Sequence, residues 1–373
     1  FESAIAAAGG DTCVGTIGGP FLTISAATAR VVSGNNVCIK ADGTYSVSGA
    51  ITAAAAGALL APTVLQGYTS TCGVNGATSD GGQATIQASA TAFTMYGPTV
   101  HTNLSNLIFD CNSKTSCTAI GFSAADDVRI DNIVIKNFGG AGVNSINTST
   151  HMTVLTNVRI TGGISGCTAG IIAVGNLHLI DSIVDTNQCS GVTTSGTSNT
   201  PGFSCSNSIS ANNAGASSDG FSFAQTVADD LLIEHCGSYG NGRDGFRWTA
   251  SAVISFSVVR NNWAYGNSGK SFDVTAGTML GVGRFDYNAY VSGSTVGFTA
   301  GAHDVVMTTD PTVAGASLNF ALNSTAGGGT ALKATGFPGV LQGGGSTGYL
   351  SIGPIQPAIN GGSGGGGFFG SIK

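Results

Sequence analysis

The sequence predicts an all-β fold, a single-stranded parallel β-helix in which short strands wind into a solenoid. Glycine occurs 59 times among the 373 residues and only 9% of the residues are charged, a composition that disfavours helices and favours short strands joined by tight turns. An asparagine and a glycine–apolar pair each recur about every 25 residues. The apolar runs between these markers are too short for amphipathic helices.

The asparagine marker follows successive apolar runs, and Gly162 takes its place once. Residues one coil apart lie above one another at the strand spacing of about 4.8 Å. Asparagine tolerates a left-handed turn, and its amide can hydrogen-bond to the next asparagine in a stack. We therefore expect a structural ladder of Asn112, Asn137, Asn187, Asn212, Asn241 and Asn267.

The second marker, a small residue followed by an apolar one, keeps the same step. It predicts a strand that sends one apolar side chain of each coil into the core. Its members begin at Gly121, Gly142, Gly170, Gly191, Gly220, Gly245, Ser271 and Gly297.

Composition and pattern divide the chain into four expected segments. They are an N-terminal cap with a short amphipathic helix and the first strand (1–48), the β-helix coils (49–300), a C-terminal closing segment (301–359) and a glycine-rich tail (360–373). In the cap, Phe21, Ile24, Ala27 and Val31 share one helical face, and Gly34 ends the helix. Because the sequence starts at Phe1, with neither an initiator Met nor a signal peptide, we expect a mature or trimmed product.

Together with the repeat, the entry segment Pro20 to Tyr45 and the closing segments Asp310 to Leu322 and Gly348 to Gln356 carry a family resemblance. The chain resembles the right-handed parallel β-helix proteins of the pectate-lyase-like superfamily, of the secreted or phage-borne type. The resemblance implies a right-handed coil and capped ends. It also implies an extracellular, cell-surface or virion location, and for the enzymes of the superfamily a polysaccharide substrate.

Charge and hydropathy argue against nucleic-acid binding and against a membrane-spanning segment. The formal net charge is −6 and the cations are scattered, whereas nucleic-acid binding needs clustered Lys and Arg. No apolar run reaches the roughly 18 residues of a membrane span. The five histidines show no metal-ligand spacing.

The nine cysteines contain no CxxC pair, which argues against a zinc or thioredoxin-type site. Cys111 and Cys117 are close enough in sequence to close a short loop by a disulfide. For the other cysteines we expect free, buried thiols.

The strongest candidates for chemistry are two acidic residues that precede the glycine–apolar marker. Asp219 and Asp244 lie one coil apart, and Lys270 holds the same phase one coil later. Two stacked carboxylates would repel, so that one pKa rises or a cation such as Ca²⁺ is recruited, while Lys270 could neutralise the second. Asp219, Asp244, Lys270 and the adjacent Arg243 are the catalytic candidates; Asp219 and Asp244 are the calcium candidates, and no other cofactor is expected.

The segment from Ser218 to Trp248 also resembles the core of one pectate-lyase family, which carries a basic catalytic residue and an aspartate-rich calcium motif. The chain departs from that pattern. Ala224 stands at the basic position, and Arg243 and Arg247 replace two of the calcium-binding aspartates. These departures favour a scaffold role over lyase chemistry.

Four aromatic residues, whose rings we expect to face the solvent, are candidates for stacking on sugar rings: Tyr239, Trp248, Trp263 and Tyr265. Tyr239 and Tyr265 each lie two residues before a ladder asparagine, which predicts a stacked pair. The alternative is an ordinary aromatic ladder.

Two functions remain open from the sequence. The first, which we favour, is a non-enzymatic structural or adhesive solenoid, such as a fibre, appendage or filament subunit that binds glycans and self-associates through its glycine-rich tail. The second is a polysaccharide lyase or glycoside hydrolase acting in a groove along the β-helix. The expected partners are further copies of the chain and a polysaccharide.

Overall fold

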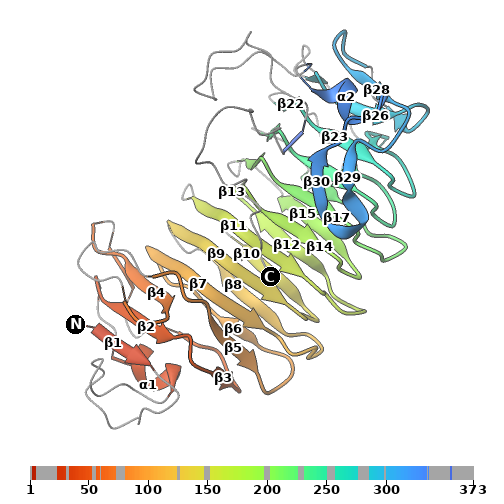
Figure 1. Cartoon of the computed structure of the whole chain (residues 1–373). Helices are drawn as coiled ribbons and strands as arrows, with labels where there is room; N and C mark the ends of the chain where they lie inside the picture. The colour runs from red at the N-terminus through yellow and green to blue at the C-terminus, as the bar shows by residue number, and fades with distance from the viewer. Residues whose placement is uncertain are drawn as a thin grey trace.

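Each coil of the chain lays strands on three faces of a parallel β-helix, and the coils stack along one axis in the computed structural model (Figure 1). The fold class expected from the sequence is confirmed. The structure describes residues 2–5, 23–30, 33–52, 56–58, 60–72, 80–123, 127–146, 152–196, 202–225, 231–249, 257–275, 285–297, 300–333, 335 and 353–354.

The first and second faces form one 19-stranded sheet with a bend along it. The first face holds β1 (Glu2–Ile5), β2 (Asn36–Lys40), β4 (Thr63–Tyr68), β13 (Leu177–Ile180), β16 (Phe203–Ser206), β19 (Leu232–Glu234), β22 (Val258–Arg260) and β25 (Phe285–Asp286). The second face holds β3 (Thr44–Val47), β5 (Ala84–Ala88), β14 (Ile183–Asp185), β17 (Ile209–Ala211), β20 (Gly237–Tyr239), β23 (Trp263–Tyr265), β26 (Ala289–Val291) and β28 (Val305–Met307). The long strands β7 (Thr102–Asp110), β9 (Val128–Lys136) and β11 (Thr153–Thr161) run through both faces.

The third face is a nine-stranded sheet. Its strands are β6 (Thr94–Tyr96), β8 (Thr118–Ser123), β10 (Ala141–Ile146), β12 (Ala169–Val174), β15 (Ser190–Gly196), β18 (Phe221–Gln225), β21 (Phe246–Trp248), β24 (Phe272–Asp273) and β27 (Thr295–Val296). Strands of the coils therefore extend from β1 (Glu2–Ile5) to β28 (Val305–Met307), whereas the expected coil region was 49–300.

Alternation along each strand sends apolar side chains into the core, and the third face shows this most clearly. Phe221, Phe246 and Phe272 stack in successive coils with ring centroids 4.9 and 5.0 Å apart, close to the strand spacing. The glycine–apolar marker holds this register from Gly142 to Ser271.

The bend between the first and second faces is made by a series of residues in the left-handed conformation, which the sequence analysis missed. Asn132 donates to Asn106 at 2.7 Å and accepts from Asn157 at 3.3 Å, one coil away on either side. The series consists of Asn106, Asn132, Asn157, Asp181, Asn207, His235, Asn261 and Tyr287, all with φ between 48° and 60°.

The turn from the second to the third face corrects the expected asparagine ladder, because that series mixes two adjacent positions. The first position is left-handed and includes Asn112, Asn137, Gly162, Thr186, Asn212, Gly240 and Gly266. The second position carries the buried hydrogen-bonded ladder: Asn187 donates to Asn213 at 2.9 Å, Asn213 to Asn241 at 2.8 Å and Asn241 to Asn267 at 2.9 Å. Asn212 therefore shapes the turn, and its neighbour Asn213 belongs to the ladder.

Four disulfides lie within the described part of the chain. The expected pair Cys111–Cys117 is one of them. The others are Cys38–Cys72, Cys167–Cys189 and Cys205–Cys236, so the expectation of free thiols is wrong for six cysteines. Cys13 lies outside the described residues.

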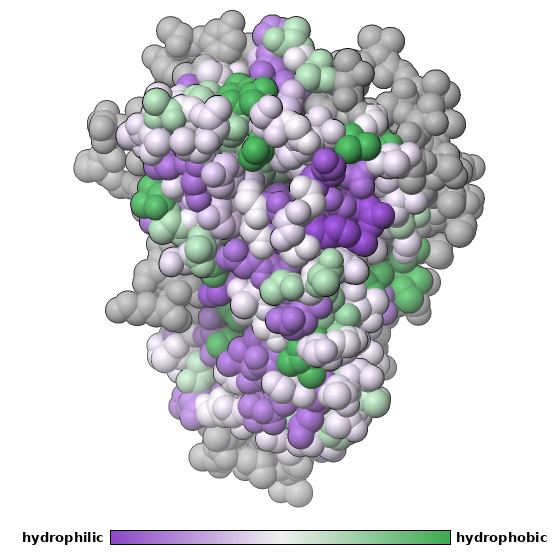
Figure 2. Space-filling model, turned by 90° about the vertical axis from the view of Figure 1, so that its right-hand side faces the viewer, coloured by the Kyte–Doolittle hydropathy of each residue, from purple (hydrophilic) through white to green (hydrophobic). Residues whose placement is uncertain are grey.

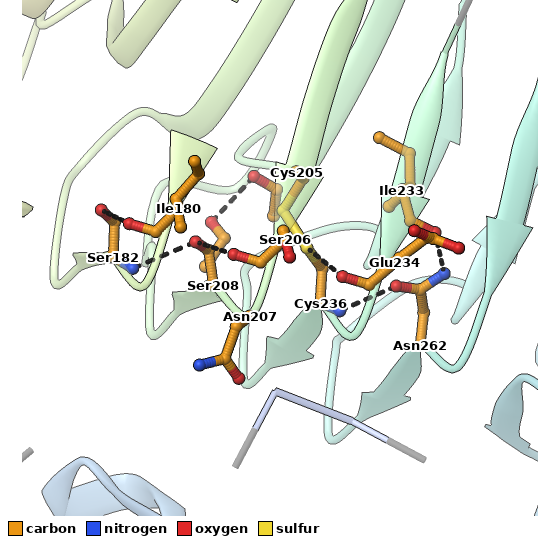
Figure 3. Close-up of a disulfide and its surroundings, with 12 residues drawn as sticks. Ile180, Ser182, Cys205, Ser206, Asn207, Ser208, Ile233, Glu234, Cys236 and Asn262 are labelled. Atoms are coloured by element: carbon orange, nitrogen blue, oxygen red, sulfur yellow. Dashed lines mark hydrogen bonds between the residues drawn. A yellow bond between two sulfur atoms is a disulfide. The ribbon is translucent and has the colours of Figure 1, made fainter. Parts of the chain in front are cut away.

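The Cys205–Cys236 disulfide joins neighbouring coils beside the first bend (Figure 3). Both cysteines are fully buried. The backbone N–H of Cys236 donates to the Asn262 side chain at 2.8 Å. The disulfide therefore links two coils, and the hydrogen bond to Asn262 links the second of them to the next coil.

The N-terminal cap contains α1 (Ile24–Thr28), where the Thr23 hydroxyl accepts the N–H of Ala26. Ile24 and Ala27 are buried, as the shared helical face predicts, while Phe21 and Val31 lie outside the described residues. No helix among the described residues is long and apolar enough to span a membrane.

The C-terminal segment lies across the outer surface of the second face. Strands β29 (Thr312–Ala314) and β30 (Asn319–Leu322) form an antiparallel hairpin around the short helix η1 (Gly315–Ser317), and α2 (Gly329–Leu332) packs beside β28. Figure 1 shows the hairpin over β17 and α2 near β28. The tail 360–373 lies outside the described residues.

Candidate functional site

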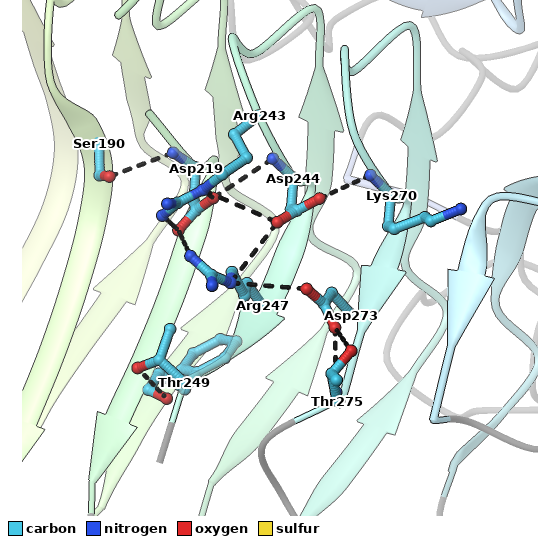
Figure 4. Close-up of polar contacts among 10 residues, drawn as sticks. Ser190, Asp219, Arg243, Asp244, Arg247, Thr249, Lys270, Asp273 and Thr275 are labelled. Atoms are coloured by element: carbon cyan, nitrogen blue, oxygen red, sulfur yellow. Dashed lines mark hydrogen bonds and ion pairs between the residues drawn. The ribbon is translucent and has the colours of Figure 1, made fainter. Parts of the chain in front are cut away.

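The predicted acidic stack lies where the chain enters the third face, and backbone hydrogen bonds fix it there (Figure 4). The N–H of Asp219 donates to the Ser190 hydroxyl at 3.1 Å. The N–H of Asp244 donates to the Asp219 carboxylate at 3.3 Å, and the N–H of Lys270 donates to the Asp244 carboxylate at 2.6 Å. Each of these side chains thus binds the backbone of the next coil.

Two arginines cover the same carboxylates. Arg243 binds Asp219 with Nε and Nη2, and the Nε to Oδ1 distance is 2.6 Å. Arg247 lies between three carboxylates, 3.9 Å from Asp219, 3.6 Å from Asp244 and 3.5 Å from Asp273. These five residues, Asp219, Arg243, Asp244, Arg247 and Asp273, are called the corner cluster below.

Burial and charge act in opposite directions within the corner cluster. Burial, together with the negative charges of Asp219 and Asp273, raises the pKa of Asp244, although the Lys270 N–H and Arg247 favour its charged form. The hydrogen bonds that Arg243 donates to Asp219 raise the pKa of Arg243. The direction agrees with the predicted rise of one carboxyl pKa, but burial rather than repulsion between the carboxylates is its largest cause.

Lys270 does not neutralise the acidic stack as expected. Its ammonium donates to the carbonyl of Gly293 at 3.3 Å, and only its backbone N–H reaches Asp244. At this turn the Asp244 carboxylate accepts the backbone N–H of Lys270, and the Lys270 side chain reaches Gly293 instead. Arg243 and Arg247 supply the positive charge instead.

The corner cluster does not fit a calcium ion. Ca²⁺ takes six to eight oxygen ligands, but both carboxylates of the stack already accept N–H groups of guanidinium or backbone. In the described parts of the chain, no group of three or more His, Cys, Asp or Glu side chains is placed to hold a metal ion. Two guanidinium groups take the place that a cation would need.

The aromatic candidates are packed rather than presented to solvent. Trp248 is 3% exposed and lies in the core between Phe223 and Phe285. Trp263 is fully buried on the outer side of the second face, where Phe320 of the hairpin covers it. The expectation of solvent-facing rings is wrong for both tryptophans.

Tyr239 and Tyr265 form the predicted stacked pair, with ring centroids 6.3 Å apart. The Tyr239 hydroxyl donates to Asp310 at 2.7 Å, and Phe320 lies against its ring. Burial and Asp310 raise the pKa of Tyr239 to about 12. The pair therefore anchors the C-terminal segment.

On the surface that Figure 2 displays, hydrophobic side chains are dispersed among polar ones.

Sequence reasoning missed Asp273 as a member of the corner cluster. A signal was available, because Arg247 and Asp273 each directly follow the apolar residue of the second marker. Cα atoms of these two residues are paired between β21 and β24, and opposite charges at one phase of a repeat predict a cross-strand ion pair.

Comparison with a solved structure supports the fold. No protein-family model and no curated protein matches the sequence. The structure is similar to that of pectate lyase Pel9A, with a TM-score of 0.71 and 14% identity over 95% of this chain and 96% of that one. A rhamnogalacturonan lyase is similar with a TM-score of 0.48 and 14% identity, over 82% and 84% of the two chains. The chain therefore has the pectate-lyase-like, right-handed parallel β-helix fold.

Proposed function

We propose that this chain is an extracellular structural or adhesive β-solenoid, a fibre, appendage or filament subunit of a cell or virus surface. The observation that carries the proposal is the closed corner cluster. The Asp219 carboxylate is fully buried and bound by Arg243 through two nitrogens. A lyase or hydrolase needs a free base or a free acid in that position; here the charged groups join one coil to the next.

The four disulfides support a location outside the cytoplasm. Disulfides persist in oxidising compartments and are rare where thiols are kept reduced. Three of them, Cys38–Cys72, Cys167–Cys189 and Cys205–Cys236, join residues of successive coils. Such bonds suit a solenoid that must keep its length and register outside the cell.

We propose further that copies of the chain associate, with the glycine-rich tail 360–373 as the contact, and that the assembly binds a polysaccharide. The tail combines a glycine run with Phe368 and Phe369, whose rings can bury apolar area on a neighbour. Light scattering tests this part. The assembly of the chain cut after Ile359 should have a smaller mass in solution than that of the full chain; an unchanged oligomeric state contradicts the role of the tail.

A second candidate is a polysaccharide-cleaving enzyme. Two observations favour it: the similarity to a pectate lyase over nearly the whole of both chains, and the raised pKa of Asp244, which is a property of general acids. In this case the substrate would lie along the third face and reach the corner cluster.

One experiment separates the two candidates. The protein is incubated with polygalacturonate, rhamnogalacturonan and alginate, with and without Ca²⁺, and unsaturated and reducing ends are measured. We expect no release of either. Release by the wild type that Asp244→Asn abolishes and Lys270→Ala preserves would replace the structural function with the enzymatic one.

A further inference from the structure

The outer surface of the first face carries a histidine and a serine side by side, far along the coil from the corner cluster. His178 on β13 and Ser204 on β16 are Cα partners in the parallel register. Their neighbours Leu179 and Cys205 are buried in the core, so alternation along the strand turns His178 and Ser204 outward. Both are partly exposed.

A chain of hydrogen bonds runs through the imidazole. The Ser204 hydroxyl lies 2.6 Å from Nδ1 of His178, and Oδ1 of Asn176 lies 3.0 Å from Nε2. Because the carbonyl oxygen of Asn176 only accepts, Nε2 carries the proton and Nδ1 is left as the acceptor. The Ser204 hydroxyl therefore donates to Nδ1.

The same surroundings keep the imidazole unprotonated. Burial lowers the pKa of His178, so the ring is neutral near pH 7 and its Nδ1 lone pair can take a proton. A hydroxyl, a base within hydrogen-bond reach and a third group that orients the base are the parts of an activated nucleophile.

We propose that Ser204 is a nucleophilic serine that His178 activates and Asn176 orients, and that it accepts acyl groups from esters of small carboxylic acids. This activity goes beyond the proposed structural function and does not depend on it. The site lies on the first face, and the corner cluster lies at the entry to the third.

The reaction balances without a cofactor. Ser204 Oγ attacks the ester carbonyl carbon while its proton passes to Nδ1 of His178. The tetrahedral intermediate collapses, the bond from carbon to the alkoxy oxygen breaks, and His178 returns the proton to the leaving alcohol. Water, deprotonated by the same nitrogen, then attacks the acyl carbon, the bond from that carbon to Ser204 Oγ breaks, and His178 gives the proton to Oγ as the carboxylic acid leaves.

The neighbours along the stack favour a small apolar acyl group. Leu232 is the Cα partner of Ser204 in the next coil and is 41% exposed. Val154 is the partner of His178 in the preceding coil and is partly exposed. The alkyl part of an acetyl or propionyl group can contact Leu232 while its carbonyl carbon faces Ser204.

Covalent labelling tests the proposal on the full chain. A fluorophosphonate probe should add once to the wild type, and peptide mass spectrometry should place it on Ser204. Ser204→Ala should remove the label. Ser206→Ala is the matched control, since Ser206 lies two residues along the same strand, also on the outer side, and this variant should label as the wild type does. Hydrolysis of p-nitrophenyl acetate should follow the same order.

The role of His178 has its own readout. His178→Gln should lower the labelling rate about 10²- to 10⁴-fold while circular dichroism and the unfolding temperature confirm that the variant is folded. An unlabelled wild type, a label that remains in Ser204→Ala, or an equal labelling rate in folded His178→Gln overturns the proposal and leaves Ser204–His178 as a hydrogen bond between coils.

Discussion

Arg243 binds the carboxylate of Asp219 across one coil with two nitrogens, while Asp219 also accepts the backbone N–H of Asp244. The buried Asp219 carboxylate thus binds both the Arg243 side chain and the Asp244 main chain of the next coil. This arrangement explains why an arginine and an aspartate stand among the glycines of the turn from Gly237 to Gly245. They hold two coils in register.

Arg243→Met should therefore destabilise the protein strongly. The substitution leaves the fully buried Asp219 carboxylate with Arg247 at 3.9 Å as its remaining ion-pair partner. Uncompensated buried charge costs about 3 kcal/mol, and urea unfolding at pH 7 measures it. Arg247→Met is the control, since contacts of 3.5 to 3.9 Å are worth about 1 kcal/mol or less. Equal losses would contradict this ranking.

The period and the strand type were predictable because each coil repeats the same physical problem. A turn needs a left-handed residue and a strand needs an inward apolar one, so both markers show in the sequence. The exact phase was not predictable, since asparagine serves at two adjacent positions for two different reasons. Asn212 has φ 53°, whereas Asn213 is buried and hydrogen-bonded.

A pair of glycine substitutions separates these two roles. Asn213→Gly removes an amide that bonds Asn187 and Asn241, and should cost about 3 kcal/mol because buried partners lose their hydrogen bonds. Asn212→Gly should be neutral or stabilise by up to about 1 kcal/mol, because glycine adopts the left-handed conformation without strain. Thermal unfolding measures both. A larger loss at Asn212 than at Asn213 would reverse the assignment.

The roles of the aromatic candidates depend on long-range packing, which the repeat does not encode. Phe320 lies against Tyr239 and Trp263 although more than fifty residues separate them. A sequence pattern with a period of one coil says nothing about a segment that returns across the outer surface. For the same reason the sequence does not reveal that Trp263 of β23, on the outer side of its strand, is covered by Phe320.

Asp304 should give the stability a dependence on pH. Burial and the charge of Asp286 raise the pKa of Asp304 to about 6, although its carboxylate accepts N–H groups of Asn288 and Gly301. Between pH 4 and pH 6, roughly, the folded chain then binds more protons than the unfolded chain at this group, so its contribution to stability falls as the pH rises through that range.

Thermal unfolding across that pH range measures the effect. Asp304→Asn should flatten the fall between about pH 4 and pH 6. Asp110→Asn is a control of opposite sign, because burial alone would raise the pKa of Asp110 but hydrogen bonds from the Asn137 side chain and the Asn112 N–H lower it, and the stability it contributes is lost only as the pH falls below about 4. An unchanged slope in Asp304→Asn would mean that another group titrates.

Docking of the C-terminal segment can be read from tryptophan fluorescence, because the chain has only two tryptophans. In a Trp248→Phe background, Trp263 reports alone, and it is fully buried beneath Phe320. Phe320→Ala should shift its emission to longer wavelength and destabilise the segment by about 3 kcal/mol, since a large apolar contact is lost. Val313→Ala, at a position 56% exposed in the same hairpin, should leave the emission unchanged. Unshifted emission in Phe320→Ala would show that the hairpin does not cover Trp263 in solution.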